Sequence, residues 1–89
     1  MTSKITRSFR RDFAALPVEV RRQAKQSYQL FKADPHHPSL KFKKLPPYPD
    51  IWSARVSQGY RAVGRWQGDV IVWFFIGSHS DYEKVIDRI

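Results

Sequence analysis

The sequence predicts a single α+β domain over residues 1–89. An N-terminal helical hairpin packs on a small antiparallel sheet, and a short helix ends the chain. Apolar residues recur every three or four positions in the first third of the chain, which is typical of amphipathic helices. The period then changes to two, as in half-buried strands. A helix-start pattern follows the last apolar run. Because helices and strands are segregated along the chain, we expect a sheet of about four strands with helices packed on it.

The helical hairpin is predicted by two apolar stripes that a proline separates. Phe9, Phe13 and Leu16 lie on one side of a first helix, because they recur at intervals of four and three residues. Pro17 interrupts this pattern and suits the first turn of a second helix. The stripe of that second helix continues to about Ala33, where a turn that contains prolines begins.

Four segments with strand-like patterns follow this turn. The first alternates Leu40 and Phe42 with Lys41 and Lys43, and the next two also alternate between two kinds of residue. The last is apolar on both faces, so we expect a central strand or one that is covered on both sides. Short connectors with glycine join the last three segments as a meander. The four segments are residues 39–45, 51–56, 60–66 and 69–76.

The terminal helix is predicted to begin at a capping box. In this arrangement Ser80 accepts a hydrogen bond from the amide of Glu83, and Glu83 reaches back to the amide of Ser80. The helix would run from Ser80 to about Arg88. His79 precedes the cap and is not needed for capping. Nearby positive groups and the helix N-terminus favour a neutral imidazole, which can act as a general base. We favour this interpretation of His79 over a surface loop histidine.

The composition restricts the partners and the chemistry. Sixteen Lys and Arg against eight Asp and Glu give a net charge of +8, which predicts nucleic acid, an acidic protein or an anionic membrane as partner. The chain has no cysteine for a disulfide or a thiolate metal site. His36 and His37 lack a third ligand at a metal-binding spacing, so we interpret them as turn residues and expect no metal or cofactor. With no apolar signal segment and no apolar run longer than Val70–Ile76, we expect a cytoplasmic protein.

The hairpin of the second and third segments brings two arginines together. If residues 57–59 form a three-residue loop, Val56 pairs with Tyr60, and Arg55 then lies directly opposite Arg61. Like charges that face each other across a ladder are destabilising. An anion can bridge such a pair, since guanidinium groups match phosphate oxygens, or both side chains can extend into solvent. Both interpretations stay open.

Basic residues also occupy the strand predicted before this hairpin. Lys41 and Lys43 project from one face of that strand, and Lys44 follows directly. If the strand joins the same sheet, these lysines and the arginine pair form a groove for a phosphate backbone. A simply solvated face is the alternative. Arg65 lies on the same side of the third segment as Arg61 and is included among the phosphate-binding candidates.

Two motifs resemble one protein family. The hairpin WSARV–YRAV and the terminal GSHSDY are similar to the RelE/ParE toxin superfamily of bacterial type II toxin–antitoxin modules, and the resemblance covers nearly the whole chain. It implies a metal-free, ribosome-dependent mRNA endonuclease of the RelE, YafQ and YoeB kind. In that reaction the ribose 2′-OH attacks the adjacent phosphate and the 5′-oxygen leaves. The implied partners are an antitoxin with an acidic segment, the ribosome and mRNA.

The same resemblance implies roles for individual residues. Arg61 matches an arginine that stabilises the pentavalent phosphate, and His79 matches an acid–base histidine. Tyr82 lies where the same turn supplies further contacts. Other members place a second histidine near the middle strands, where residues 50–78 of this chain have none. Lys41, Lys43 and Lys44 lie where other members place basic residues that bind RNA, and Arg55 matches a hairpin arginine whose role is often partly structural. With Arg65, these residues are our candidates for binding RNA or its phosphates.

Two alternative functions stay open at this point. The superfamily also contains ParE-like toxins that poison DNA gyrase without nuclease chemistry. A chain of this charge can also be a non-catalytic module that binds RNA or an antitoxin. The retained histidine turn favours the endonuclease over the gyrase poison.

Overall fold

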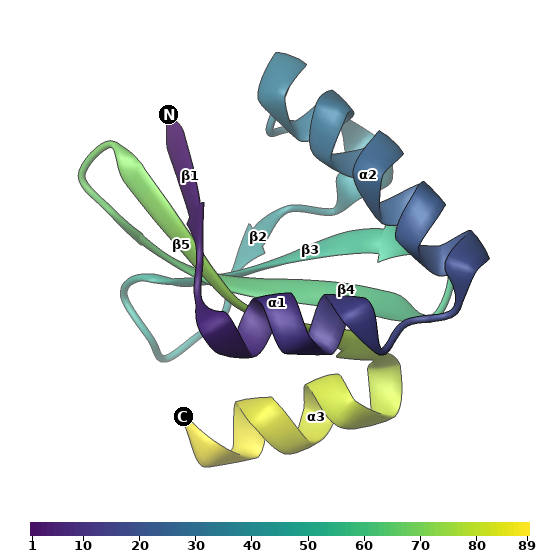
Figure 1. The fold of residues 1–89 in the computed structure, drawn as a ribbon. Coiled ribbons are helices and arrows are strands. Elements are labelled where there is room, and N and C mark those ends of the chain that lie inside the picture. The colour runs from purple at the N-terminus through teal and green to yellow at the C-terminus, as the bar shows by residue number, and fades with distance from the viewer.

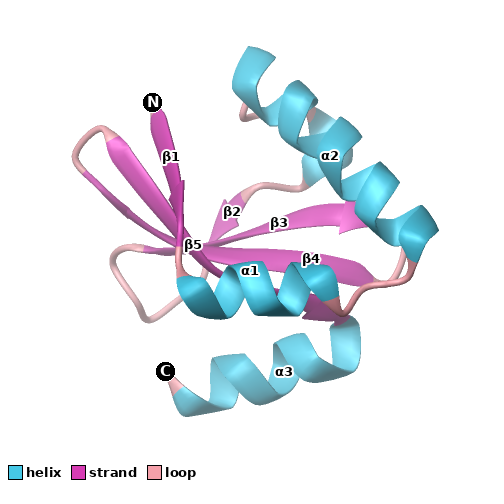
Figure 2. Ribbon diagram, in the orientation of Figure 1, coloured by secondary structure: helices cyan, strands magenta, loops and turns pink.

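A computed structural model describes residues 1–89, which form five strands and three α-helices (Figures 1 and 2). The predicted α+β class is confirmed. The sheet has the order β1-β5-β4-β3-β2 and is mixed, because β1 runs parallel to β5 while the other pairs are antiparallel. The elements are β1 (Thr2–Ile5), α1 (Arg7–Ala14), α2 (Val18–Ala33), the 3₁₀ turn η1 (Pro38–Leu40), β2 (Lys43–Lys44), β3 (Ile51–Ser57), β4 (Tyr60–Gln67), β5 (Val70–Ser78) and α3 (His79–Arg88).

The strand β1 is a fifth strand that the sequence pattern did not predict. It pairs with the first half of β5, from Thr2 opposite Val70 to Ile5 opposite Trp73. The start of α1 then continues along the same edge of β5, where the Ser8 hydroxyl donates to the carbonyl of Phe74 at 3.0 Å. The backbone polar groups on this edge of β5 are therefore bonded first by β1 and then, at Phe74, by the start of α1.

The strand predicted over residues 39–45 is mostly wrong. Leu40 lies in η1 instead and is buried in the core. Lys41 follows with a positive φ of 46°, which no strand residue adopts. Only Lys43 and Lys44 pair with β3, and two prolines come directly after Leu45. A proline has no amide to donate, so the ladder ends there.

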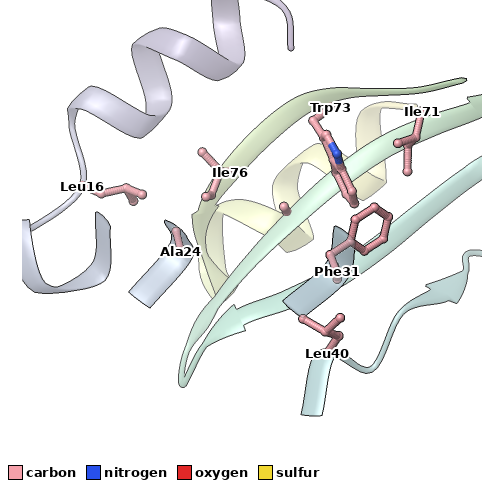
Figure 3. Close-up of a cluster of buried hydrophobic side chains, with 9 residues drawn as sticks. Leu16, Ala24, Phe31, Leu40, Ile71, Trp73 and Ile76 are labelled. Atoms are coloured by element: carbon pink, nitrogen blue, oxygen red, sulfur yellow. The ribbon is translucent and has the colours of Figure 1, made fainter. Parts of the chain in front are cut away.

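Two hydrophobic clusters lie on opposite faces of the sheet. Successive side chains of a strand point to opposite faces, and Ala62 belongs to one cluster while Val63 belongs to the other. The first cluster lies under α1 and α2, and Figure 3 shows Phe31 of α2 against Trp73 of β5. The second cluster includes Tyr82 of α3, which packs on the other face (Figure 1). The prediction that the last strand is covered on both sides is confirmed.

None of the three helices is long and apolar enough to cross a membrane.

Asp50 joins the start of β3 to the end of β4. Its carboxylate accepts hydrogen bonds from Gln67 at 2.8 Å and from Arg65 at 3.0 Å. Its carbonyl accepts from the amide of Trp66 at 2.8 Å. The hydrogen bond from Gln67, followed by the bond and charge of Arg65, holds the pKa of Asp50 below its ordinary value of 3.8. A lowered pKa means that the ionised form stabilises the folded chain.

Asp50→Asn removes this charge and is expected to lower the free energy of unfolding at neutral pH. The contribution of such a carboxylate is present above its unfolded pKa and is lost as the pH falls through the lower, folded value. Urea unfolding of both chains at about pH 7 and about pH 2.5 measures the difference. We expect the difference in free energy of unfolding between the wild type and Asp50→Asn to disappear at the lower pH. An equal difference in stability at both pH values would show that the charge of Asp50 does not cause it.

Candidate functional site

The turn from β5 into α3 carries the predicted histidine. The helix begins at His79, and the Ser78 hydroxyl caps it by accepting from the amide of Asp81 at 3.2 Å. The capping box predicted at residues 80–83 is therefore wrong, because the helix starts earlier. The amide of His79 donates to the carbonyl of Gly59 at 2.9 Å, which ties the helix start to the β3–β4 turn. The backbone of His79 is thus fixed at one end of the sheet.

The facing arginines are confirmed, although the loop between them differs from the predicted one. Ser57 pairs with Tyr60 across a two-residue turn, and the register shifts at Val56. This irregularity restores the expected alignment, so Arg55 lies directly opposite Arg61. Two cationic side chains therefore share the face of the sheet on which α3 packs.

Arg61 has an unsatisfied polar atom. Its Nη1 is buried and has no hydrogen-bond partner. The guanidinium carbon lies 5.4 Å from the centre of the Tyr82 ring, which is a cation–π contact. A buried donor without an acceptor costs free energy, and the cost is larger for a charged group. The guanidinium of Arg61 therefore has no anionic partner within the chain.

Tyr82 brings the three candidate catalytic residues together. Its ring is 7% exposed, and its centre lies 5.7 Å from that of the His79 ring. Arg61 contacts the same ring. The side chain of His79 is 55% exposed, and its Nε2 lies 3.1 Å from Oε1 of Glu83. The arrangement offers a half-buried cation that can bind an oxyanion and an exposed imidazole that can exchange a proton.

The candidate lysines are only partly brought to this face. Lys43 pairs with Ser53, so it shares the face of Arg55, which is two residues further along β3. Lys44 is next to Lys43 on the strand and therefore points to the opposite face. Lys41 is exposed but lies outside β2. Lys43 is thus the lysine that the sheet aligns with the arginine pair.

Arg65 has a structural partner of its own. Its guanidinium binds Asp50, at the end of β4 that is remote from the β3–β4 turn. Because His79 contacts that turn, the structure does not bring Arg65 to the group around Tyr82.

Two further features were missed by the sequence analysis. Glu83 contacts His79 rather than a backbone amide, since the predicted cap, Ser80, lies two residues after the observed cap, Ser78. A groove of about 520 Å³ also lies between α1, α2 and the sheet. Its lining is largely apolar, with Arg10, Lys25 and Arg55 as the charged residues and no acidic one. Distant segments form this groove, so no local pattern could predict it.

Among the histidines and acidic residues, no three side chains lie together as a metal site would require. The side chain of His37 instead accepts from the amide of Ser39 at 3.2 Å, in the turn where it was expected.

The unsatisfied guanidinium leads to a test of stability. Arg61→Met removes a buried donor without a partner, and we expect it to raise the free energy of unfolding by about 1 kcal/mol. Arg65→Met is the matched control on the same strand, and it should lower stability because it breaks the ion pair with Asp50. Urea unfolding of the two variants and the wild type compares these effects. A loss of stability in Arg61→Met would show that Arg61 is structural.

Solved toxin structures share this fold. A chain of the RelB–RelE antitoxin–toxin complex from Methanococcus jannaschii is 18% identical with a TM-score of 0.72, over 92% of this chain and 96% of that one. The YoeB/ParE toxin from Agrobacterium tumefaciens is 19% identical with a TM-score of 0.70, over 89% and 99%. The isolated E. coli RelE toxin is 20% identical with a TM-score of 0.67, over 98% and 96%. At these identities the similarity establishes the fold.

The family follows from the sequence match. A comparison with curated protein sequences gave no match. Residues 18–84, however, match the family described as the ParE-like toxin domain. This range runs from the start of α2 into α3 and includes Arg61, His79 and Tyr82. Because the match covers well over half of the chain, the protein belongs to the ParE-like toxin family, within the RelE/ParE superfamily.

Proposed function

We propose that the protein is the toxin of a type II toxin–antitoxin module and cleaves mRNA on the ribosome. Membership of a toxin family supports the first part. The second part rests on the group around Tyr82, where the unpaired guanidinium of Arg61 and the exposed imidazole of His79 contact one ring. Tyr82 thus holds two groups: a cation without an anionic partner, and a group that can transfer a proton. Both groups suit the cleavage of a phosphodiester.

In this proposal the substrate phosphate binds at the arginine pair. The ribose 2′-oxygen attacks the phosphorus, the bond to the 5′-oxygen breaks, and the products carry a 2′,3′-cyclic phosphate and a 5′-hydroxyl. The guanidinium of Arg61 donates to a phosphate oxygen as negative charge develops there. Arg55, directly opposite, adds a second guanidinium. An anion between them would also relieve the repulsion of the two like charges.

His79 is proposed to transfer the proton. It takes the proton of the 2′-hydroxyl or supplies one to the leaving 5′-oxygen, and its exposure leaves room for a substrate. Tyr82 holds His79 and Arg61 in place through its ring. Lys43, on the same face of the sheet, is proposed to bind a neighbouring phosphate, while Lys41, Lys44 and Arg65 contribute at longer range.

The groove between α1 and α2 is proposed to receive the antitoxin. Several structural neighbours are toxins in complex with an antitoxin, such as the RelB–RelE complex of M. jannaschii. Here the groove has an apolar floor, the cationic residues Arg10 and Lys25, and no acidic residue. The indole Nε1 of Trp73, a lining residue that is 6% exposed, has no hydrogen-bond partner. An acidic segment with an apolar side matches this surface in charge and chemistry.

The alternative is a toxin that poisons DNA gyrase, and the match to a ParE-like toxin domain supports it. That activity needs no proton transfer, so it would not depend on His79. A non-catalytic RNA-binding module would not arrest growth at all. The three functions therefore differ in what expression of the protein does to a cell.

Inducible expression in a bacterial host tests the nuclease directly. We expect growth arrest and new 5′ ends within the reading frame of a reporter mRNA, detected by primer extension. His79→Ala and Arg61→Ala should each reduce this cleavage by at least about 100-fold, since each removes a group that acts in the transition state. Arg22→Ala is the control, because Arg22 lies on the exposed face of α2 and binds only Glu19.

The outcomes separate the alternatives. Growth arrest with DNA damage and intact mRNA, unchanged in His79→Ala, would favour the gyrase poison. No arrest from the wild type would leave the binding module. Equal cleavage by His79→Ala and the wild type would remove the proposed role of the histidine.

The antitoxin groove can be tested with the candidate antitoxin, which this proposal expects to be a small acidic protein encoded beside the gene. We expect Lys25→Glu to weaken the complex by about tenfold or more in a titration, because it places a negative charge in a groove that has none. Arg22→Glu makes the same charge change on α2 outside the groove and should have a smaller effect. Equal affinities of the two variants would place the antitoxin elsewhere.

A further inference from the structure

We propose that Glu83 is a positioning residue for His79: its carboxylate holds the imidazole through Nε2 and leaves Nδ1 free for proton transfer. This inference rests on the proposed nuclease function. The observation that carries it is the 3.1 Å contact between Nε2 of His79 and Oε1 of Glu83. Glu83 has no other hydrogen-bond or ion-pair partner, so its side chain is committed to the histidine.

The position of the two residues in α3 makes the contact possible. They are four residues apart, and side chains at this spacing lie on the same side of a helix. Since the helix begins at His79 rather than at Ser80, Glu83 does not act in the cap, and Ser78 has that role alone. The carboxylate of Glu83 is therefore not used in the helix cap and lies on the surface beside the imidazole of His79.

The imidazole is held from three directions. The amide of His79 donates to Gly59, which fixes the backbone. The Tyr82 ring lies on one side at 5.7 Å between centres. Glu83 supplies the contact that sets the rotation of the ring about its side-chain bonds. Without that contact an imidazole that is 55% exposed could adopt several rotamers.

The orientation matters because this site has a single histidine. A carboxylate 3.1 Å from Nε2 favours the proton on that nitrogen, so in the proposed state the lone pair of the neutral ring is on Nδ1, which has no partner in the structure. A base that accepts a proton is most effective when a third group fixes its tautomer and direction. Glu83 contacts the histidine and not the substrate, so its effect is exerted through His79.

The contact itself can be measured in the free protein. Three-bond NMR couplings report the side-chain rotamer of His79 in the wild type, in Glu83→Ala and in Glu83→Gln. We expect one dominant rotamer in the wild type, averaging in Glu83→Ala, and retention in Glu83→Gln, whose amide oxygen still accepts from Nε2. Asp87→Asn is the control, because it removes a negative charge from the same helix at a residue without a partner.

The cleavage assay with purified ribosomes then measures the consequence. Glu83→Ala should lower kcat by about threefold to fivefold with little change in KM, in keeping with an exposed pair. Glu83→Gln should recover most of this loss, and Asp87→Asn should match the wild type. A helix merely weakened by the loss of Glu83 would give no rescue by glutamine and no change of rotamer.

Two results would overturn the proposal. One is an unchanged His79 rotamer in Glu83→Ala, which would mean that Tyr82 and the backbone suffice. The other is a changed rotamer with unchanged cleavage. If the wild type does not cleave mRNA at all, the proposed function fails, and with it the role of Glu83 in catalysis. The NMR comparison would still decide whether Glu83 orients the ring, so the two failures can be told apart.

Discussion

The structure depends on the burial of β5, which has a partner on each edge and a hydrophobic cluster on each face. Ile71 and Phe75 of this strand belong to the two clusters on opposite faces. The last residues of β5 pair with the first residues of β4, so Gly77 lies opposite Arg61. A Cβ atom at Gly77 would lie 2.8 Å from the end of the Phe75 ring, so a larger residue there would force that ring to shift. The same burial therefore places the start of α3 beside the arginine pair.

The two faces of the sheet differ in the side chains that they carry. The face under α1 and α2 carries the larger hydrophobic cluster, and the face under α3 carries the facing arginines and the buried donor without a partner. Residues 1–33 contain eight of the sixteen Lys and Arg but only two of the eight Asp and Glu. Most of the net charge thus lies on β1, α1 and α2, beside the groove rather than at the candidate active site. A partner in that groove and a substrate at α3 would occupy separate surfaces.

The local chemistry of the sequence determined much of this arrangement. Apolar periods predicted the first two helices and the three strands of the meander, because each element buries one side or both. The pairing of Arg55 with Arg61 followed from strand alternation, and the irregularity at Val56 preserved it although the turn is shorter than expected. The grouping of Arg61, His79 and Tyr82 followed from the family motifs, which name residues that are distant in the chain.

Only the tertiary structure decided the rest. The segment of β1 is too short for a period, and it is a strand because the edge of β5 needs a partner. Ser78 and Ser80 are equally good caps, and α3 starts at His79 where its amide meets Gly59. The contact of Glu83 with His79 follows from that start. The sequence determined which residues are buried and which can do chemistry, while partners that are distant in the chain decided where each element begins and what each polar group contacts.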